Sequence, residues 1–116
     1  MANIAMLERH LLTLYSSGCY ISNFDLLHIA KECGIHIDLS DRVKMLKKLL
    51  AQAKEEQKTE KLLRSFIHLY QKRIQEYQRL YERTPIPPLQ EHLQKATATI
   101  RLLQISIQKE CYGSDL

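Results

Sequence analysis

Two matched apolar repeats on either side of a proline-rich segment constrain the fold of this 116-residue chain most strongly. In each repeat the apolar positions alternate spacings of four and three residues, which indicates one helix face packed along another helix. The first repeat consists of Leu63, Ile67, Tyr70, Ile74, Tyr77 and Tyr81, and the second of Leu89, Leu93, Ala96, Ile100, Leu103 and Ile107. Because Pro cannot continue a helix interior, the segment TPIPP between them predicts a long antiparallel helical hairpin.

The repeats also predict how the two hairpin helices are aligned. Positions 81 and 89, 77 and 93, and 74 and 96 each sum to 170. If residues whose numbers sum to 170 lie opposite each other, every apolar position of one repeat faces an apolar position of the other. Other apolar residues lie outside this seam and need a further cover: Phe66, Leu69, Leu80, Leu102 and Ile105. Either the N-terminal helices of the same chain or a second copy of the chain would provide it.

Shorter amphipathic helices are predicted for the N-terminal half. The first contains Ile4, Leu7, Leu11, Leu12 and Tyr15 and stops at Gly18, and the second runs from an N-cap at Asn23 to Gly34. Asp38 or Ser40 caps a third helix, whose apolar positions are Leu39, Val43, Leu46, Leu50 and Ala53. A polar stretch follows, and we expect a break or bend near residues 57–59.

Composition supports a helical protein. The chain is 45% hydrophobic and 26% charged, with only three Gly and three Pro. We therefore expect one all-α domain over residues 1–116, a bundle of four to five helices. Short N-terminal helices (3–58) pack on a helical hairpin (59–110), and the tail (111–116) frays.

The start of the chain and its cysteines bear on location. The first ten residues carry charges where a signal peptide needs an apolar run, and the longest uncharged stretch, residues 10–24, is too short to span a bilayer. Three cysteines cannot all pair. We expect a cytoplasmic protein with reduced cysteines and no membrane contact.

Residues 29–35, IAKECGI, resemble the first helix and turn of bacterial helix-turn-helix repressors. The resemblance implies a recognition helix starting near Asp38 and a role in transcriptional control within residues 26–48. The excess of positive charge lies nearby, since residues 41–64 hold eight Lys and Arg against four Asp and Glu. The residues that would contact the nucleic acid are Arg42, Lys44, Lys47 and Lys48. Asp38 and Asp41 would repel phosphates at that helix end, so we favour an ordinary helix closed by Gly34.

Catalytic and metal sites are not expected. His28, Cys33 and His36 lie close in sequence, but no second ligand pair completes a zinc site. Glycine occurs only at positions 18, 34 and 113, which leaves no glycine-rich phosphate loop, and no nucleophile stands beside an oriented base in a recognisable pattern. We expect no enzyme activity, no cofactor and no small-molecule substrate.

A protein-interaction role is the function that the pattern favours most. Tyrosines in the hairpin seam suit a half-wet groove, because a buried Tyr hydroxyl needs a partner. The sequence predicts an adaptor, small chaperone or assembly subunit that binds a partner helix or self-associates. Its predicted partner-binding residues are Tyr70, Tyr77, Tyr81, Phe66, Leu102 and Ile105. The alternative is the helix-turn-helix-like nucleic-acid-binding regulator.

Overall fold

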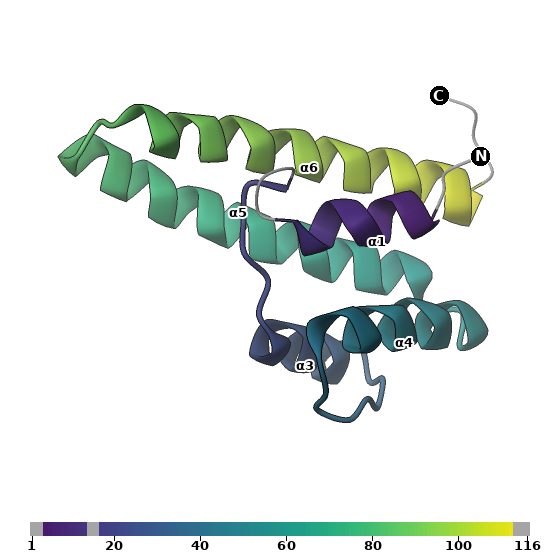
Figure 1. The fold of residues 1–116 in the computed structure, drawn as a ribbon. Helices are drawn as coiled ribbons and strands as arrows, with labels where there is room; N and C mark the ends of the chain where they lie inside the picture. The colour runs from purple at the N-terminus through teal and green to yellow at the C-terminus, as the bar shows by residue number, and fades with distance from the viewer. Residues whose placement is uncertain (1–3, 14–16, 113–116) are drawn as a thin grey trace.

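A computed structural model describes residues 4–13 and 17–112 of the chain. Its helices are α1 (Ile4–Leu12), α3 (Asn23–Glu32), α4 (Arg42–Glu55), α5 (Thr59–Arg83) and α6 (Pro87–Tyr112) (Figure 1). No strand occurs in these described ranges. The protein is an all-α bundle, as its periodicity and composition predict.

The long helices α5 and α6 run antiparallel and form the predicted hairpin (Figure 1). The ring of Tyr77 lies 6.3 Å from that of His92, and the Tyr112 hydroxyl donates a hydrogen bond to Glu60 at 2.7 Å. The residue numbers in these two pairs sum to 169 and 172, close to the sum of 170 predicted from the repeats. Pro87 and Pro88 occupy the first turn of α6, where a missing N–H costs nothing.

The predicted break between α4 and α5 is also confirmed. Helix α4 ends at Glu55 and α5 begins at Thr59. Between them Gln57 has a positive φ of 57°, a conformation that no helix interior contains. The chain therefore reverses here without Gly or Pro.

The N-terminal caps differ by one to three residues from the prediction. Ser22, not Asn23, caps α3: its side chain accepts from the Asp25 amide while the Asp25 carboxylate accepts from the Ser22 amide. Asn23 instead donates to the Ser40 carbonyl at 2.6 Å. Asp41, rather than Asp38 or Ser40, caps α4.

The later start of α4 changes which of its residues are buried. Leu39 lies before the helix and is exposed, and Val43 in its first turn is 46% exposed. The buried face consists of Met45, Leu46, Leu49, Leu50 and Ala53. The predicted apolar seam is thus correct from Leu46 onward and wrong at its first two positions.

Two predicted helix ends also need correction. Helix α1 ends at Leu12, before Gly18, and Tyr15 lies outside the described residues. Helix α6 continues to Tyr112, so the first two residues of the predicted frayed tail are helical. Residues 113–116 lie beyond the described range.

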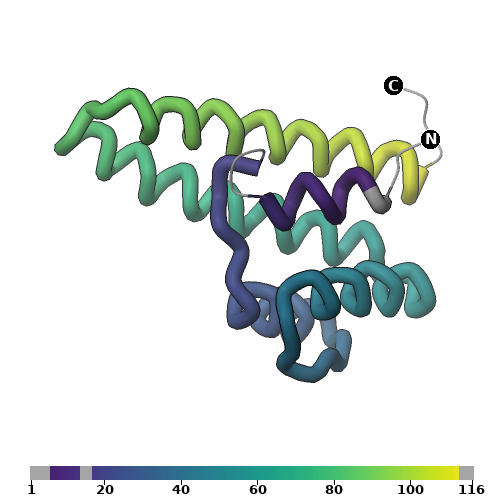
Figure 2. Tube along the Cα trace, viewed as in Figure 1, coloured from purple at the N-terminus to yellow at the C-terminus, as the bar shows by residue number. Residues whose placement is uncertain are grey.

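Residues 17–22 run from beside α6 across α5 and lead into α3 (Figure 2). Gly18 lies so close to α6 that a Cβ there would stand 2.5 Å from the Ala96 nitrogen. The Thr99 hydroxyl of α6 lies 2.9 Å from the Ser17 carbonyl and 2.8 Å from Nε2 of His10 in α1. This segment therefore anchors the N-terminal helices to the middle of the hairpin.

Candidate interaction surface

The short helices cover only one half of the hairpin. Helices α3 and α4 contact α5, and the end of the hairpin that carries the turn extends past both of them (Figure 1). From residue 78 to residue 91 every side chain is exposed except Tyr81 and Leu89, which are half-buried. We refer to residues 78–91 as the outer arm.

One apolar stripe of α5 continues from the covered half onto the outer arm. Leu62, Leu69 and Leu80 share a helix face, because separations of 7 and 11 residues return to the same side. Leu62 is fully buried and Leu69 packs partly against the core, but Leu80 is 48% exposed. The outer arm thus exposes an apolar residue on the helix face that is buried in the covered half of α5.

Further exposed apolar residues lie where the outer arm meets the start of α3. Arg73 pairs with Asp25 at 2.9 Å and donates to the Tyr20 carbonyl at 3.3 Å, so this part of α3 sits beside α5. Tyr20 is 49% exposed, and Phe24, next to Asp25, is 72% exposed. At the hairpin turn, Ile86 is also exposed. The outer arm and the start of α3 together form the candidate interaction surface.

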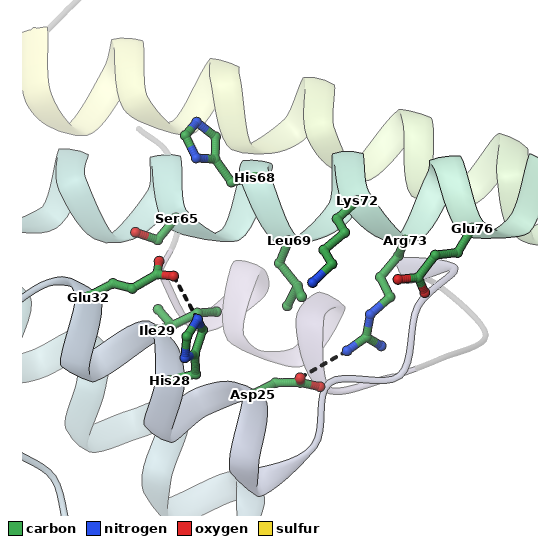
Figure 3. Close-up of a pocket in the computed structure, with 10 residues that line it drawn as sticks. All are labelled: Asp25, His28, Ile29, Glu32, Ser65, His68, Leu69, Lys72, Arg73 and Glu76. Carbon is green, nitrogen blue, oxygen red and sulfur yellow. Dashed lines mark hydrogen bonds and ion pairs between the residues drawn. The ribbon is translucent and has the colours of Figure 1, made fainter.

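Next to this surface a cleft of about 340 Å³ separates α3 from α5 (Figure 3). Its floor includes Ile29 and Leu69. The acid and base side chains mostly pair with one another: His28 with Glu32 at 2.8 Å, and Arg73 with Asp25.

A hydroxyl also lines the cleft. The Ser65 hydroxyl lies 3.5 Å from the Cys33 sulfur, and among the residues the structure describes no histidine hydrogen-bonds it.

The predicted partner-binding residues fall into three groups. Phe66 and Tyr70 are fully buried core residues, so in this packing their side chains are not accessible to a partner. Tyr77 and Tyr81 are half-buried, and the burial of Tyr77 raises the pKa of its hydroxyl. Leu102 packs partly against the core, whereas Ile105 lines a separate pocket with Arg64 and Arg101. The structure does not bring these residues together on one surface.

Burial of the tyrosines has a local cause. The segment that crosses the hairpin places Ser17 and Cys19 against Tyr70 and Tyr77, and burial raises the pKa of the Tyr70 hydroxyl and of the Cys19 thiol, the latter to about 11. The Tyr70 hydroxyl is buried without a hydrogen bond of good geometry. The segment has no helical periodicity, so its residue pattern does not indicate that it covers the seam.

The residues proposed for nucleic-acid contact are unevenly available. Arg42 donates through Nε to the Ile21 carbonyl at 2.6 Å and through Nη2 to the Leu12 carbonyl at 3.0 Å, and its guanidinium lies 4.3 Å from the centre of the Tyr20 ring. Lys44 faces the capping carboxylate of Asp41 at 3.8 Å. Lys47 and Lys48 are exposed.

The connection between α3 and α4 is also longer than the helix-turn-helix resemblance implies. Residues 33–41 separate the two helices, whereas the DNA-binding motif joins its helices by a three- or four-residue turn. The second helix begins at Arg42 and not near Asp38.

The described ranges contain neither a metal-binding cluster nor a membrane-spanning helix. There, no group of three or more His, Cys, Asp or Glu side chains is placed to hold a metal ion. Cys33 is buried beside Ser65, while His36 points toward Asp38 at 3.4 Å. None of the described helices combines the length and apolar character needed to span a bilayer.

The chain matches no protein-family model, no curated protein and no solved structure. The geometry of the candidate surface is therefore what bears on function.

Proposed function

We propose that this protein is a non-enzymatic protein-interaction module, an adaptor, small chaperone or assembly subunit, that binds an amphipathic helix along the outer arm. The observation that carries the proposal is the stripe Leu62, Leu69 and Leu80, which α3 and α4 cover at one end and leave uncovered at the other. A buried leucine gains about 1.5–3 kcal/mol over an exposed one, so a helix that covers Leu80 is stabilised there.

The shape next to Leu80 suits a helix lying alongside α5. Leu80 is seven residues, or about 10 Å, from Arg73 along the helix axis. Arg73 holds the start of α3 against α5 through Asp25, and the exposed Phe24 stands there. A partner helix packed on Leu80 would reach Phe24 within two turns, which matches the apolar anchor spacing of helices bound in grooves.

Two observations support this role over nucleic-acid binding. Arg42 uses its guanidinium to join three parts of its own chain, which leaves fewer of its donors for a phosphate. Asp38 and Asp41 are exposed at the start of α4, where a nucleic-acid backbone would approach. The lysines Lys47 and Lys48 then act as ordinary exposed charges.

The test compares two exposed apolar residues of similar accessibility. Leu80 is 48% exposed on the outer arm, and Val43 is 46% exposed on α4. Tagged wild type, Leu80→Lys and Val43→Lys would each be used to capture proteins from a lysate of the source, with and without nuclease. We expect wild type and Val43→Lys to retain the same partner and Leu80→Lys to lose it.

The other results of this experiment contradict the proposal in different ways. Equal capture by Leu80→Lys and wild type would place the binding surface elsewhere. Capture that disappears with nuclease would favour the nucleic-acid-binding regulator, and neutralising Lys47 and Lys48 should then weaken it and reduce its dependence on salt.

A further inference from the structure

We infer that the helix received by the outer arm is α5 of a second copy of this chain, packed antiparallel about a twofold axis beside Leu80. This inference rests on the proposed function and names the partner. Three observations carry it: the area that the chain leaves exposed, the charges that flank Leu80, and the positions of the other exposed apolar residues.

The chain exposes more surface than a compact monomer of its mass. It has 13.6 kDa and exposes 7406 Å², whereas a compact monomer of that mass exposes about 6,600 Å². The excess, about 800 Å², is large enough for one side of an interface of standard size. The radius of gyration of 14.3 Å also exceeds the roughly 13.4 Å of a compact domain of this length.

The charges beside Leu80 are complementary to the same charges on a second copy of the chain. Glu76 and Arg83 lie four residues before and three residues after Leu80, one heptad apart on the same side of α5. Both are exposed, and neither forms an ion pair with another described residue. In an antiparallel pair related by a twofold axis, residues on the same flank face each other.

One alignment of the two helices places each of these charges opposite a charge of opposite sign. If residue i of one copy lies opposite residue 159 − i of the other, Glu76 faces Arg83 of the second copy and Arg83 faces its Glu76. Position 80 then falls opposite position 79 of the second copy, so the two Leu80 residues lie about one residue apart along the helices, next to the axis. The interface is isologous, so this one ion pair forms twice by symmetry.

The same alignment brings three more exposed apolar residues, Tyr20, Phe24 and Ile86, toward the second copy. Ile86 lies in the turn, three residues past the end of α5, and this alignment brings the turn of one copy toward Arg73 of the other. Arg73 binds Asp25 and the Tyr20 carbonyl, and the exposed side chains of Tyr20 and Phe24 lie there. Exposed apolar residues at the arm, the turn and the start of α3 would thus be buried by one symmetric contact.

A charge exchange tests this pairing in the full-length chain. We expect sedimentation equilibrium to give twice 13.6 kDa for the wild type at about 100 μM, above the micromolar Kd that interfaces of this size reach. Glu76→Arg alone and Arg83→Glu alone each place like charges across the axis and should raise the dimer Kd about tenfold or more. Mixed together, the two variants offer opposite charges at both sites, so a heterodimer of wild-type affinity should form.

Controls separate this interface from general destabilisation. Leu80→Lys should be monomeric and Val43→Lys dimeric, and circular dichroism should show wild-type helicity for both. A monomeric wild type would overturn the inference, as would a dimer indifferent to Leu80→Lys, or single charge variants that fail to pair when mixed. A monomer that still captures a different protein through Leu80 would refute self-pairing and leave the proposed function intact.

Discussion

Gly18 provides the most direct test of how the N-terminal helices are anchored to the hairpin. Its φ is 84°, and a Cβ at this position would lie 2.5 Å from the Ala96 nitrogen and 2.6 Å from the His92 carbonyl oxygen. Both obstructing atoms belong to the backbone of α6, so no side-chain rotation relieves the overlap. Gly18→Ala therefore has to push the crossing segment away from α6.

The size of the effect follows from three contributions. A left-handed conformation costs a residue with a Cβ about 1 kcal/mol, and overpacking adds about 1–3 kcal/mol. Displacing the segment also weakens the hydrogen bond from Thr99 to the Ser17 carbonyl, worth about 1 kcal/mol. We expect Gly18→Ala to lower the free energy of unfolding by about 3–5 kcal/mol, a large part of the 5–15 kcal/mol typical of a domain.

Gly34 is the matched control, since it has a similar φ of 67° but much more space. Its added Cβ would meet only the Lys58 ammonium nitrogen at 3.4 Å, at the end of a flexible side chain. Gly34→Ala should thus cost about 1 kcal/mol, from conformation alone. Urea unfolding followed by circular dichroism measures both variants. Equal losses, within about 1 kcal/mol, would refute the close packing of residue 18 on α6.

Three further predictions concern His10, the cysteines and Arg42. Burial lowers the pKa of His10 below its ordinary value of 6.5, so the folded state resists protonation of this histidine. The free energy of unfolding should therefore fall as the pH drops below about 6.5. In thermal melts, His10→Gln should make the stability depend less on pH. In the native protein, Cys111 should react with a thiol reagent first, and the buried Cys19 and Cys33 should react only after unfolding. Fast modification of all three thiols would contradict the burial of Cys19 and Cys33. Arg42→Lys should lower the free energy of unfolding in urea by about 2 kcal/mol, because lysine cannot donate to two carbonyls and stack on Tyr20 at once. As a control, Lys48→Gln on the exposed surface should lower it by less than about 0.5 kcal/mol.

The hairpin could be predicted because its information is local and repeated. Six apolar positions on each side of the proline turn give the same spacing, so an error at one of them changes little. The helix caps were less predictable, because Ser22 and Asn23, like Ser40 and Asp41, are all competent caps in adjacent positions. The choice depends on the tertiary contact from Asn23 to the Ser40 carbonyl, which periodicity does not reveal.

The candidate surface was only partly visible in the sequence. Leu80 stood out as an apolar residue that the two-helix seam does not cover, and it is exposed. Periodicity assigned Phe66 and Tyr70 to the hairpin, but it could not show that both are fully buried, Tyr70 beside Ser17 of the irregular segment. Phe24 would be taken for a core residue by its type alone, and its exposure follows from the position of α3 on α5.

The outer arm is finally a consequence of unequal helix lengths. The 25 residues of α5 span about 37 Å, whereas the 14 residues of α4 span about 21 Å. Gly18 and Arg73 fix where the N-terminal part crosses the hairpin, so the short helices cannot slide outward to cover Leu80. About 16 Å of α5 therefore extends beyond the reach of α4. Apart from its hairpin partner α6, no described helix lies along this stretch of α5, and a helix from outside the chain is what we propose covers Leu80.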